Sequence, residues 1–190
     1  MKSILSREQK KESVHIPVIM SQSGLEEVVY NDFYIGENAD VTIIAGCGIH
    51  NGGDAASRHD GIHRFFIGKN AHVKYVEKHY GSGDGSGERI MNPVTEISLD
   101  EDSFMEMETV QIRGVDSTKR ENRAHLKAGA KLVVMERLMT HGKQKAEAGL
   151  TCSLTERTLL PILCPDLWQE MNPGSCSSPT SAEIPDAADT

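Results

Sequence analysis

Aromatic side chains are scarce in this chain, and basic side chains are outnumbered by acidic ones. Phe, Trp and Tyr make up 5% of its 190 residues, and 20 Lys and Arg stand against 28 Asp and Glu, for a net charge of −8. An acidic surface repels phosphate backbones, so we expect no nucleic-acid partner. No stretch reaches the ~20 apolar residues of a membrane-spanning helix, and the N-terminus has no signal-peptide pattern. We therefore expect a soluble, cytoplasmic protein that does not bind membranes.

The sequence also has no C-x-x-C pair among its 4 cysteines, which argues against a thioredoxin-type site or a zinc ribbon. Cys152, Cys164 and Cys176 lie near the C-terminus and are interpreted as incidental thiols. Cys47 differs, because it stands between two glycines in an ordered-looking segment. It is either a small buried residue or, with His50 as a neighbouring imidazole, an activated thiol or a soft-metal ligand.

What the chain does contain is an internal repeat. Four segments align without gaps, at 30–43, 62–75, 94–107 and 121–134, and their starts are 32, 32 and 27 residues apart. Apolar residues recur at alternate positions within each segment, which indicates strands with one face turned inward. Two such columns read Phe33, Phe65, Ile97, Ala124 and Val41, Val73, Met105, Leu132.

A further column of the repeat, between the two apolar ones, predicts a tight corner between two strands. It holds Asn38, Asn70, Asp102 and Gly129, residue types that tolerate a positive φ. A unit of ~30 residues that cannot bury its inner face alone must stack on its neighbours, as in a solenoid. The repeat therefore predicts an all-β parallel β-helix. In the third unit, the alternation is expected to change parity at Val110 and Ile112, as at a bend or bulge.

The two ends depart from the repeat, and they divide the chain into three parts. Residues 1–20 are a charged lead-in with a short strand at 15–20, and residues 21–150 are the β-helix core. Residues 151–190 are an atypical tail: a weak cap over 159–168, then a Pro- and Ser-rich segment expected to be disordered. The abrupt change of composition raises the hypothesis that this tail is out of frame or truncated.

Other polar groups match no catalytic template. The run 81–87 (GSGDGSG) lacks the Gly-Lys-Ser/Thr of a phosphate loop and is interpreted as a flexible loop between coils. His59 and His63 fall on a strand, where residues four apart cannot share one metal ion, so we expect them to face solvent. Most carboxylates, among them Glu77, are likewise interpreted as outward strand positions. The metal ligands, if any, are unknown, and no catalytic set is found.

Four stretches carry a resemblance to a known family. They are 41–47 (VTIIAGC), 66–75 (FIGKNAHVKY), the Gly-rich 81–87 leading to Asn92, and 128–142 (AGAKLVVMERLMTHG). In their order and spacing, over roughly residues 14–150, they resemble the core domain of the SufB/SufD family. Those proteins are right-handed parallel β-helix components of the SUF machinery that assembles iron–sulfur clusters. The resemblance is to short members of the family rather than to the long chains.

The resemblance implies a scaffold rather than an enzyme. Family members pair as SufB/SufD-like subunits, bind a SufC-like ATPase, and receive sulfur from a cysteine desulfurase system. The cysteine of the matching Gly-Cys segment is a proposed sulfur acceptor, which points to Cys47, and a thiolate between two glycines would be accessible. The only cofactor implied is a transient iron–sulfur cluster. The tail lacks the family's further coils and helical ATPase-binding region, so no cluster ligand is carried over.

Two other classes of function stay open. The segments 35–41 (IGENADV) and 67–73 (IGKNAHV) resemble turns of hexapeptide-repeat acyltransferases, although here the motif recurs after 32 residues. Binding of coenzyme A would favour that enzyme class. The third class is a non-catalytic solenoid that binds another protein through an exposed strand edge.

Overall fold

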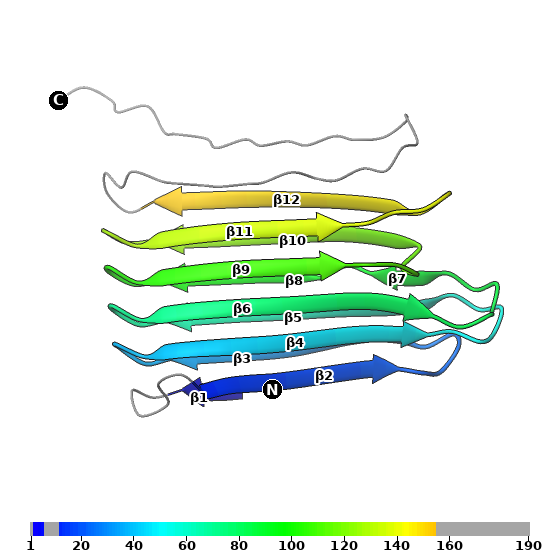
Figure 1. Cartoon of the computed structure of the whole chain (residues 1–190), viewed down its shortest axis with the longest axis horizontal. Helices are drawn as coiled ribbons and strands as arrows, with labels where there is room; N and C mark the ends of the chain where they lie inside the picture. Colours follow the sequence, from blue (N-terminus) through cyan, green and yellow to red (C-terminus); the bar gives the residue numbers. More distant parts are fainter. Residues whose placement is uncertain (1, 6–11, 155–190) are drawn as a thin grey trace, which may run out of the picture.

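The computed structural model describes residues 2–5 and 12–154, and every regular element in these ranges is a β-strand (Figure 1). The strands are β1 (Lys2–Leu5), β2 (Glu12–Met20), β3 (Glu26–Ile35), β4 (Asp40–His50), β5 (Ser57–Ile67), β6 (His72–Ser82), β7 (Arg89–Met91), β8 (Val94–Leu99), β9 (Phe104–Gln111), β10 (Ser117–Leu126), β11 (Lys131–Leu138) and β12 (Lys145–Leu154).

The strands form two parallel sheets that face each other. Sheet A has the order β1-β3-β5-β7-β10-β12, with β8 also pairing between β5 and β10, and sheet B has the order β11-β9-β6-β4-β2. Except between β7 and β8, which both belong to sheet A, the chain crosses from one sheet to the other after each strand. It advances by one layer per turn, so the described part is a β-solenoid of about four turns (Figure 1). The predicted all-β parallel β-helix is confirmed.

The stacking register is the one that the repeat predicts. Tyr30 pairs with Ile62, Ile62 with Val94, and Val94 with Glu121, so the four repeat starts lie side by side in sheet A. One inward column of that sheet contains Phe33 and Phe65, whose rings stack with centroids 4.5 Å apart. Apolar side chains at these positions pack against their own equivalents one turn away, which keeps the turns in register.

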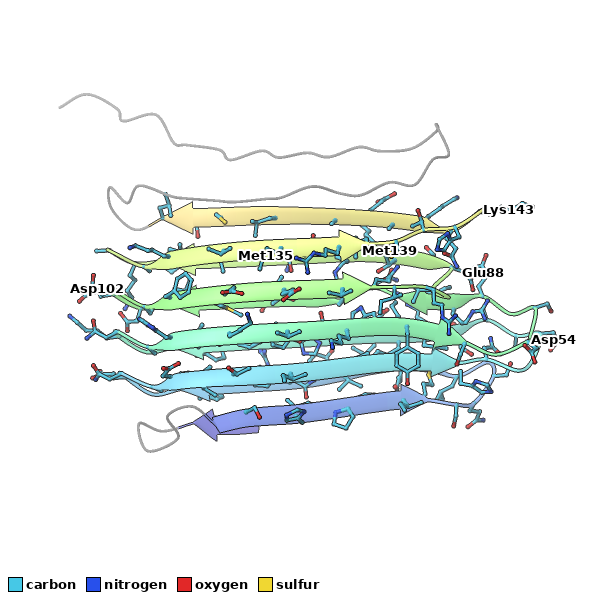
Figure 2. All side chains as sticks on the ribbon, viewed as in Figure 1. Asp54, Glu88, Asp102, Met135, Met139 and Lys143 are labelled. Carbon is cyan, nitrogen blue, oxygen red and sulfur yellow. The ribbon has the colours of Figure 1, made fainter. Side chains whose placement is uncertain are left out.

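The corners between the sheets also follow the prediction. Asn38, Asn70 and Asp102 have φ values of 57°, 55° and 55°, and Gly129 takes their place in the last turn with φ 70°. Figure 2 shows Asp102 at this tightly turned edge, whereas Asp54 and Glu88 lie in longer loops at the opposite edge. A left-handed residue lets the chain reverse direction within one short turn, so each turn has one narrow and one wide edge.

The Gly-rich run at the wide edge lies directly on the loop of the previous turn. The amide of Gly85 donates to the carbonyl of Asn51, and that of Gly87 donates to the carbonyl of Gly53. A Cβ on Gly83, Gly85 or Gly87 would collide with backbone carbonyls of that loop. The glycines therefore permit close stacking of two backbones, which is a more specific role than the predicted flexible loop.

The solenoid extends beyond both expected ends of the core. β1 pairs with β3 and β2 pairs with β4, so residues of the lead-in belong to the first turn. At the other end, β12 pairs with β10 as far as Leu154, past the expected boundary at residue 150. The predicted cap and Pro/Ser-rich tail at 155–190 lie outside the described residues. Within the described ranges, no helix has the length and apolar character needed to cross a bilayer.

Candidate functional site

A layer of buried polar side chains interrupts the apolar interior of the solenoid. The main hydrophobic cluster lies towards the narrow edge and contains the Phe33, Phe65 and Tyr75 rings. A smaller cluster is formed by Met20, Cys47, Ile49, Met91 and Val115. Part of the set of buried polar residues is called here the polar layer; it consists of Asn31, His63, Glu77, His79, Thr95, Thr109, Gln111, Arg120 and Asn122.

An ion pair between the two sheets forms the centre of the polar layer. Nη2 of Arg120, on β10 of sheet A, lies 2.7 Å from Oε2 of Glu77, on β6 of sheet B, and both side chains are 1% exposed. Nε of Arg120 also lies 3.3 Å from Oε1 of Glu136 on β11. Removing a charged group from water costs on the order of several kcal/mol of free energy. The buried partners of Arg120 and Glu77 must offset this cost.

Two histidines complete the contacts of this pair. Nη1 of Arg120 is 2.9 Å from Nδ1 of His79, and Nε2 of His79 is 3.3 Å from Oε1 of Glu77. Nε2 of His63 lies 3.2 Å from the same oxygen, and the hydroxyl of Tyr75 donates to it at 3.1 Å. Because a guanidinium only donates, Nδ1 of His79 accepts and its ring proton is on Nε2.

The local sequence leaves room for this packing. His63 lies two residues after Gly61 on β5, and a Cβ at Gly61 would approach Nε2 of His63 to 2.6 Å. A larger side chain at position 61 would therefore push the imidazole away from Glu77. Because Gly61 has no side chain, the imidazole ring of His63 can lie over position 61 of the same strand.

The environment sets the protonation of Glu77 and His79. Burial alone would raise the pKa of Glu77, but the electrostatic interaction with the His79 ring and the hydrogen bonds from His63 and His79 outweigh it and hold the pKa well below its usual range. Burial lowers the pKa of His79, against the opposing effect of Glu77. Glu77 is therefore a carboxylate and His79 a neutral ring at physiological pH.

Cys47 lies beside these groups on β4. It pairs in register with His79 on β6 and is 3% exposed. Burial, followed by the negative charge of Glu77, raises the pKa of the thiol to about 12. The expectation of an accessible thiolate is wrong for this fold, because the two flanking glycines are in a strand whose Cys47 side chain points into the solenoid.

Cys47, Glu77 and His79 nevertheless form a compact set of potential metal ligands. Sγ of Cys47, a carboxylate oxygen of Glu77 and a ring nitrogen of His79 all lie within 4.8 Å of one another. Thiolate and imidazole are ligands of zinc, iron and other borderline metals, and a carboxylate is a common third ligand. The group is therefore chemically suited to a metal ion or to iron–sulfur chemistry.

The polar layer also contains donors and acceptors that the described residues leave unpaired. Both amide atoms of Gln111, which is 0% exposed, and the hydroxyl of Thr109 have no hydrogen-bond partner among residues 2–5 and 12–154. Gln111 pairs in register with His79, so Cys47, His79 and Gln111 form one inward row across sheet B. Buried amides without partners are rare and indicate an internal water or ligand.

The other histidines singled out in the sequence lie elsewhere. His50 is exposed at the end of β4, with Nδ1 3.1 Å from the Ser82 hydroxyl, so it is not among the groups that contact Cys47. The expectation that His59 and His63 face solvent is wrong. Both are buried inward positions of β5, and His59 Nδ1 lies 2.7 Å from a carboxylate oxygen of Glu27.

Two further expectations fail for the same reason. Glu77 is a fully buried residue, not a solvated outward one, and no parity change occurs in β9. The alternation continues through Thr109 and Gln111, which point inward, while Ile112 is exposed. Apolar character indicates which strand positions point inward only where the interior is apolar, and it fails in the polar layer.

The repeat itself contained the signal that would have located the site. Adding the 32-residue spacing to Cys47 gives His79 and then Gln111, and subtracting it from Thr109 gives Glu77. Cys47, His79 and Gln111 therefore share one column of the repeat, and Glu77 and Thr109 share another. Both columns point inward. The partner from the opposite sheet, Arg120, has no such signal, because its contact depends on how the two sheets face each other.

Comparison of the chain with family models, with curated proteins and with solved structures finds no match.

Proposed function

We propose that this protein is a scaffold component of SUF-type iron–sulfur cluster assembly, in which Cys47 accepts sulfur or supports cluster formation. The observation that carries the proposal is the position of Cys47 within 4.8 Å of donor atoms of Glu77 and His79. Thiolate, imidazole and carboxylate are ligand types found at iron centres, and thiolate also receives sulfur by persulfide exchange. The β-solenoid provides a rigid frame that keeps the three groups together.

The proposed sulfur transfer is an exchange between the Cys47 thiol and a donor persulfide. The Cys47 thiol loses its proton, and its sulfur attacks the outer sulfur of a donor persulfide. The donor's S–S bond breaks as the new S–S bond forms, and the donor leaves as a thiol carrying the proton. The result is a persulfide on Cys47, with no change in the total number of sulfur atoms or electrons.

The burial of Cys47 places a condition on this transfer. On one side, Cys47 pairs with Val18 of β2, which is the last strand of sheet B among the described residues. Edge strands open more readily than internal ones, because only one neighbour holds them. Sulfur delivery therefore requires displacement of β2, and a partner that binds this edge of the solenoid would provide it.

The partners follow from the same proposal. A SufC-like ATPase, a SufB/SufD-like subunit and a cysteine desulfurase system are the proteins with which such a scaffold works. Co-purification of an ABC-type ATPase from the native source supports this assignment. A native complex that contains neither the ATPase nor a second solenoid subunit contradicts it.

The direct test is sulfur loading of the full chain. Incubation with a cysteine desulfurase and cysteine is expected to add one sulfur atom to the peptide that contains Cys47, as measured by mass spectrometry after alkylation. Cys47→Ser should abolish this addition, whereas the control Cys152→Ser should retain it. Sulfur that is found in equal amount on Cys47→Ser would exclude Cys47 as the acceptor.

A further inference from the structure

The buried donor set in the solenoid interior also supports an inference that does not depend on sulfur transfer. We propose that Cys47, Glu77 and His79 form a binding site for one borderline divalent metal ion, such as Zn²⁺ or Fe²⁺, and that Arg120 supplies the positive charge while the site is empty. The donor atoms lie within 4.8 Å of one another on two adjacent strands. A metal ion with ligand bonds of about 2.0–2.3 Å would draw them closer by a small adjustment of side-chain torsions.

Arg120 competes with the metal ion for two of the three ligands. Its Nη2 is 2.7 Å from Oε2 of Glu77, and its Nη1 is 2.9 Å from Nδ1 of His79. The second contact keeps the imidazole proton on Nε2, the nitrogen that faces Glu77. Metal binding at Nε2 requires this proton to move to Nδ1, which breaks the hydrogen bond with Arg120. Arg120 is therefore a positioning residue that favours the empty site.

The charges of the polar layer are compatible with a divalent ion. Two carboxylates, Glu77 and Glu136, face one guanidinium in the empty site, which leaves one negative charge in excess. A divalent cation that binds with release of the Cys47 thiol proton to solvent makes the group neutral. Because Arg120 retains its contact with Glu136, it has an alternative partner when the metal takes Glu77 and His79.

Gln111 provides an independent indication of a ligand. It follows His79 in the inward row of sheet B, it is 0% exposed, and neither of its amide atoms has a partner among the described residues. The amide oxygen can accept a hydrogen bond from a metal-bound water or act as a further oxygen ligand. A metal ion with a bound water would thus satisfy a buried group that the protein alone leaves unpaired.

The experiment uses the full chain with Cys47 as its single thiol, in a Cys152→Ser, Cys164→Ser, Cys176→Ser background. The protein is refolded from denaturant with or without Co²⁺ and then desalted, because the buried site is open to the ion only before the turns close. We expect one Co²⁺ per chain and a near-ultraviolet thiolate-to-cobalt charge-transfer band. Saturation with Co²⁺ at ~100 times its Kd should raise Tm by roughly 5–10 °C.

Three variants locate the site and test the role of Arg120. Cys47→Ser should lose the bound Co²⁺, and His79→Gln should weaken binding at least about tenfold, whereas His50→Gln serves as the control and should bind as the parent does. Arg120→Met should bind Co²⁺ about tenfold more tightly or better, because the competing cation is gone. If Arg120→Met does not fold alone, Co²⁺ should restore its β-sheet circular dichroism.

Two results would overturn the proposal. One is a Co²⁺ content that persists undiminished in Cys47→Ser, which assigns the ion to another site. The other is the absence of bound Co²⁺ from both the parent and Arg120→Met after refolding, which leaves the ion pair with a structural role only. Neither result bears on sulfur loading of Cys47, which is measured without added metal.

Discussion

In the apolar part of the solenoid interior, Phe33 stacks on Phe65 with ring centroids 4.5 Å apart, whereas in the polar layer Arg120 meets Glu77 at 2.7 Å. The first contact joins equivalent positions of successive turns within one sheet, and the second joins different positions of opposite sheets. Ring stacking tolerates changes of shape, but a buried ion pair is stable only when both members are present. The two regions should therefore respond differently to the loss of a side chain.

The largest effect is expected in the apolar stack. Phe65→Ala should lower the free energy of unfolding by about 3–5 kcal/mol, because it removes a fully buried ring that touches both Phe33 and Tyr75 and leaves a cavity. Urea unfolding followed by circular dichroism measures the loss. The control is Phe66→Ala, the next residue, whose side chain is 37% exposed and should cost much less. Equal losses in the two variants would contradict the assigned burial.

A loss of similar size, but of another kind, is expected in the polar layer. Arg120→Ala should cost about 3–5 kcal/mol, because Glu77 is left as an unpaired buried charge. The double change Glu77→Met, Arg120→Met removes both charges and should recover most of the stability. Chemical denaturation of the single and double variants forms a double-mutant cycle. Additive losses would show that the two side chains do not stabilise each other.

The thiol should make stability depend on pH in the alkaline range. The pKa of Cys47 is about 12 in the folded protein, raised mainly by burial from its ordinary value of 9.0. The unfolded chain therefore loses this proton first, and unfolding becomes more favourable as the pH rises above 9. Between pH 9 and 10, wild type should lose about 1 kcal/mol more than Cys47→Ala, as measured by urea unfolding at each pH. Parallel curves for the two proteins would show that the thiol is not buried.

The smallest effect is expected at the narrow edge, away from both interior regions. Asn70→Ala should cost about 1 kcal/mol, because alanine disfavours the φ of 55° at this corner. Asn70→Gly is the matched control and should be close to neutral, since Gly129 occupies the equivalent corner with φ 70°. Thermal unfolding of the two variants makes the comparison. A larger loss for glycine than for alanine would argue against a left-handed corner.

The fold could be predicted from the sequence because its signals repeat. The apolar columns that contain Phe33 and Phe65, and the corner column that contains Asn38 and Asn70, recur in four turns, so each position was supported by its equivalents. The strand ends were less predictable. β2 and β12 extend the solenoid with residues whose composition differs from that of the repeat, and only their backbone pairing shows that they belong to it.

The site was only partly predictable. Cys47 was identified from its flanking glycines, but Glu77 and His63 were assigned to the solvent because polar residues are mostly exposed. Alternation cannot tell which of two faces is inward when both carry polar groups. The continued 32-residue spacing resolves this for His79 and Gln111, whereas no spacing connects Arg120 with Glu77.

The sequence by itself determined that the chain forms stacked strands with left-handed corners, since these depend on local backbone preferences and on contacts between identical positions of successive turns. Only the tertiary structure decided that the interior contains an ion pair and a protonated thiol. The reason is physical: Cys47, Glu77 and Arg120 come from three strands in two sheets, and their protonation depends on the distances and burial that arise when the sheets face each other.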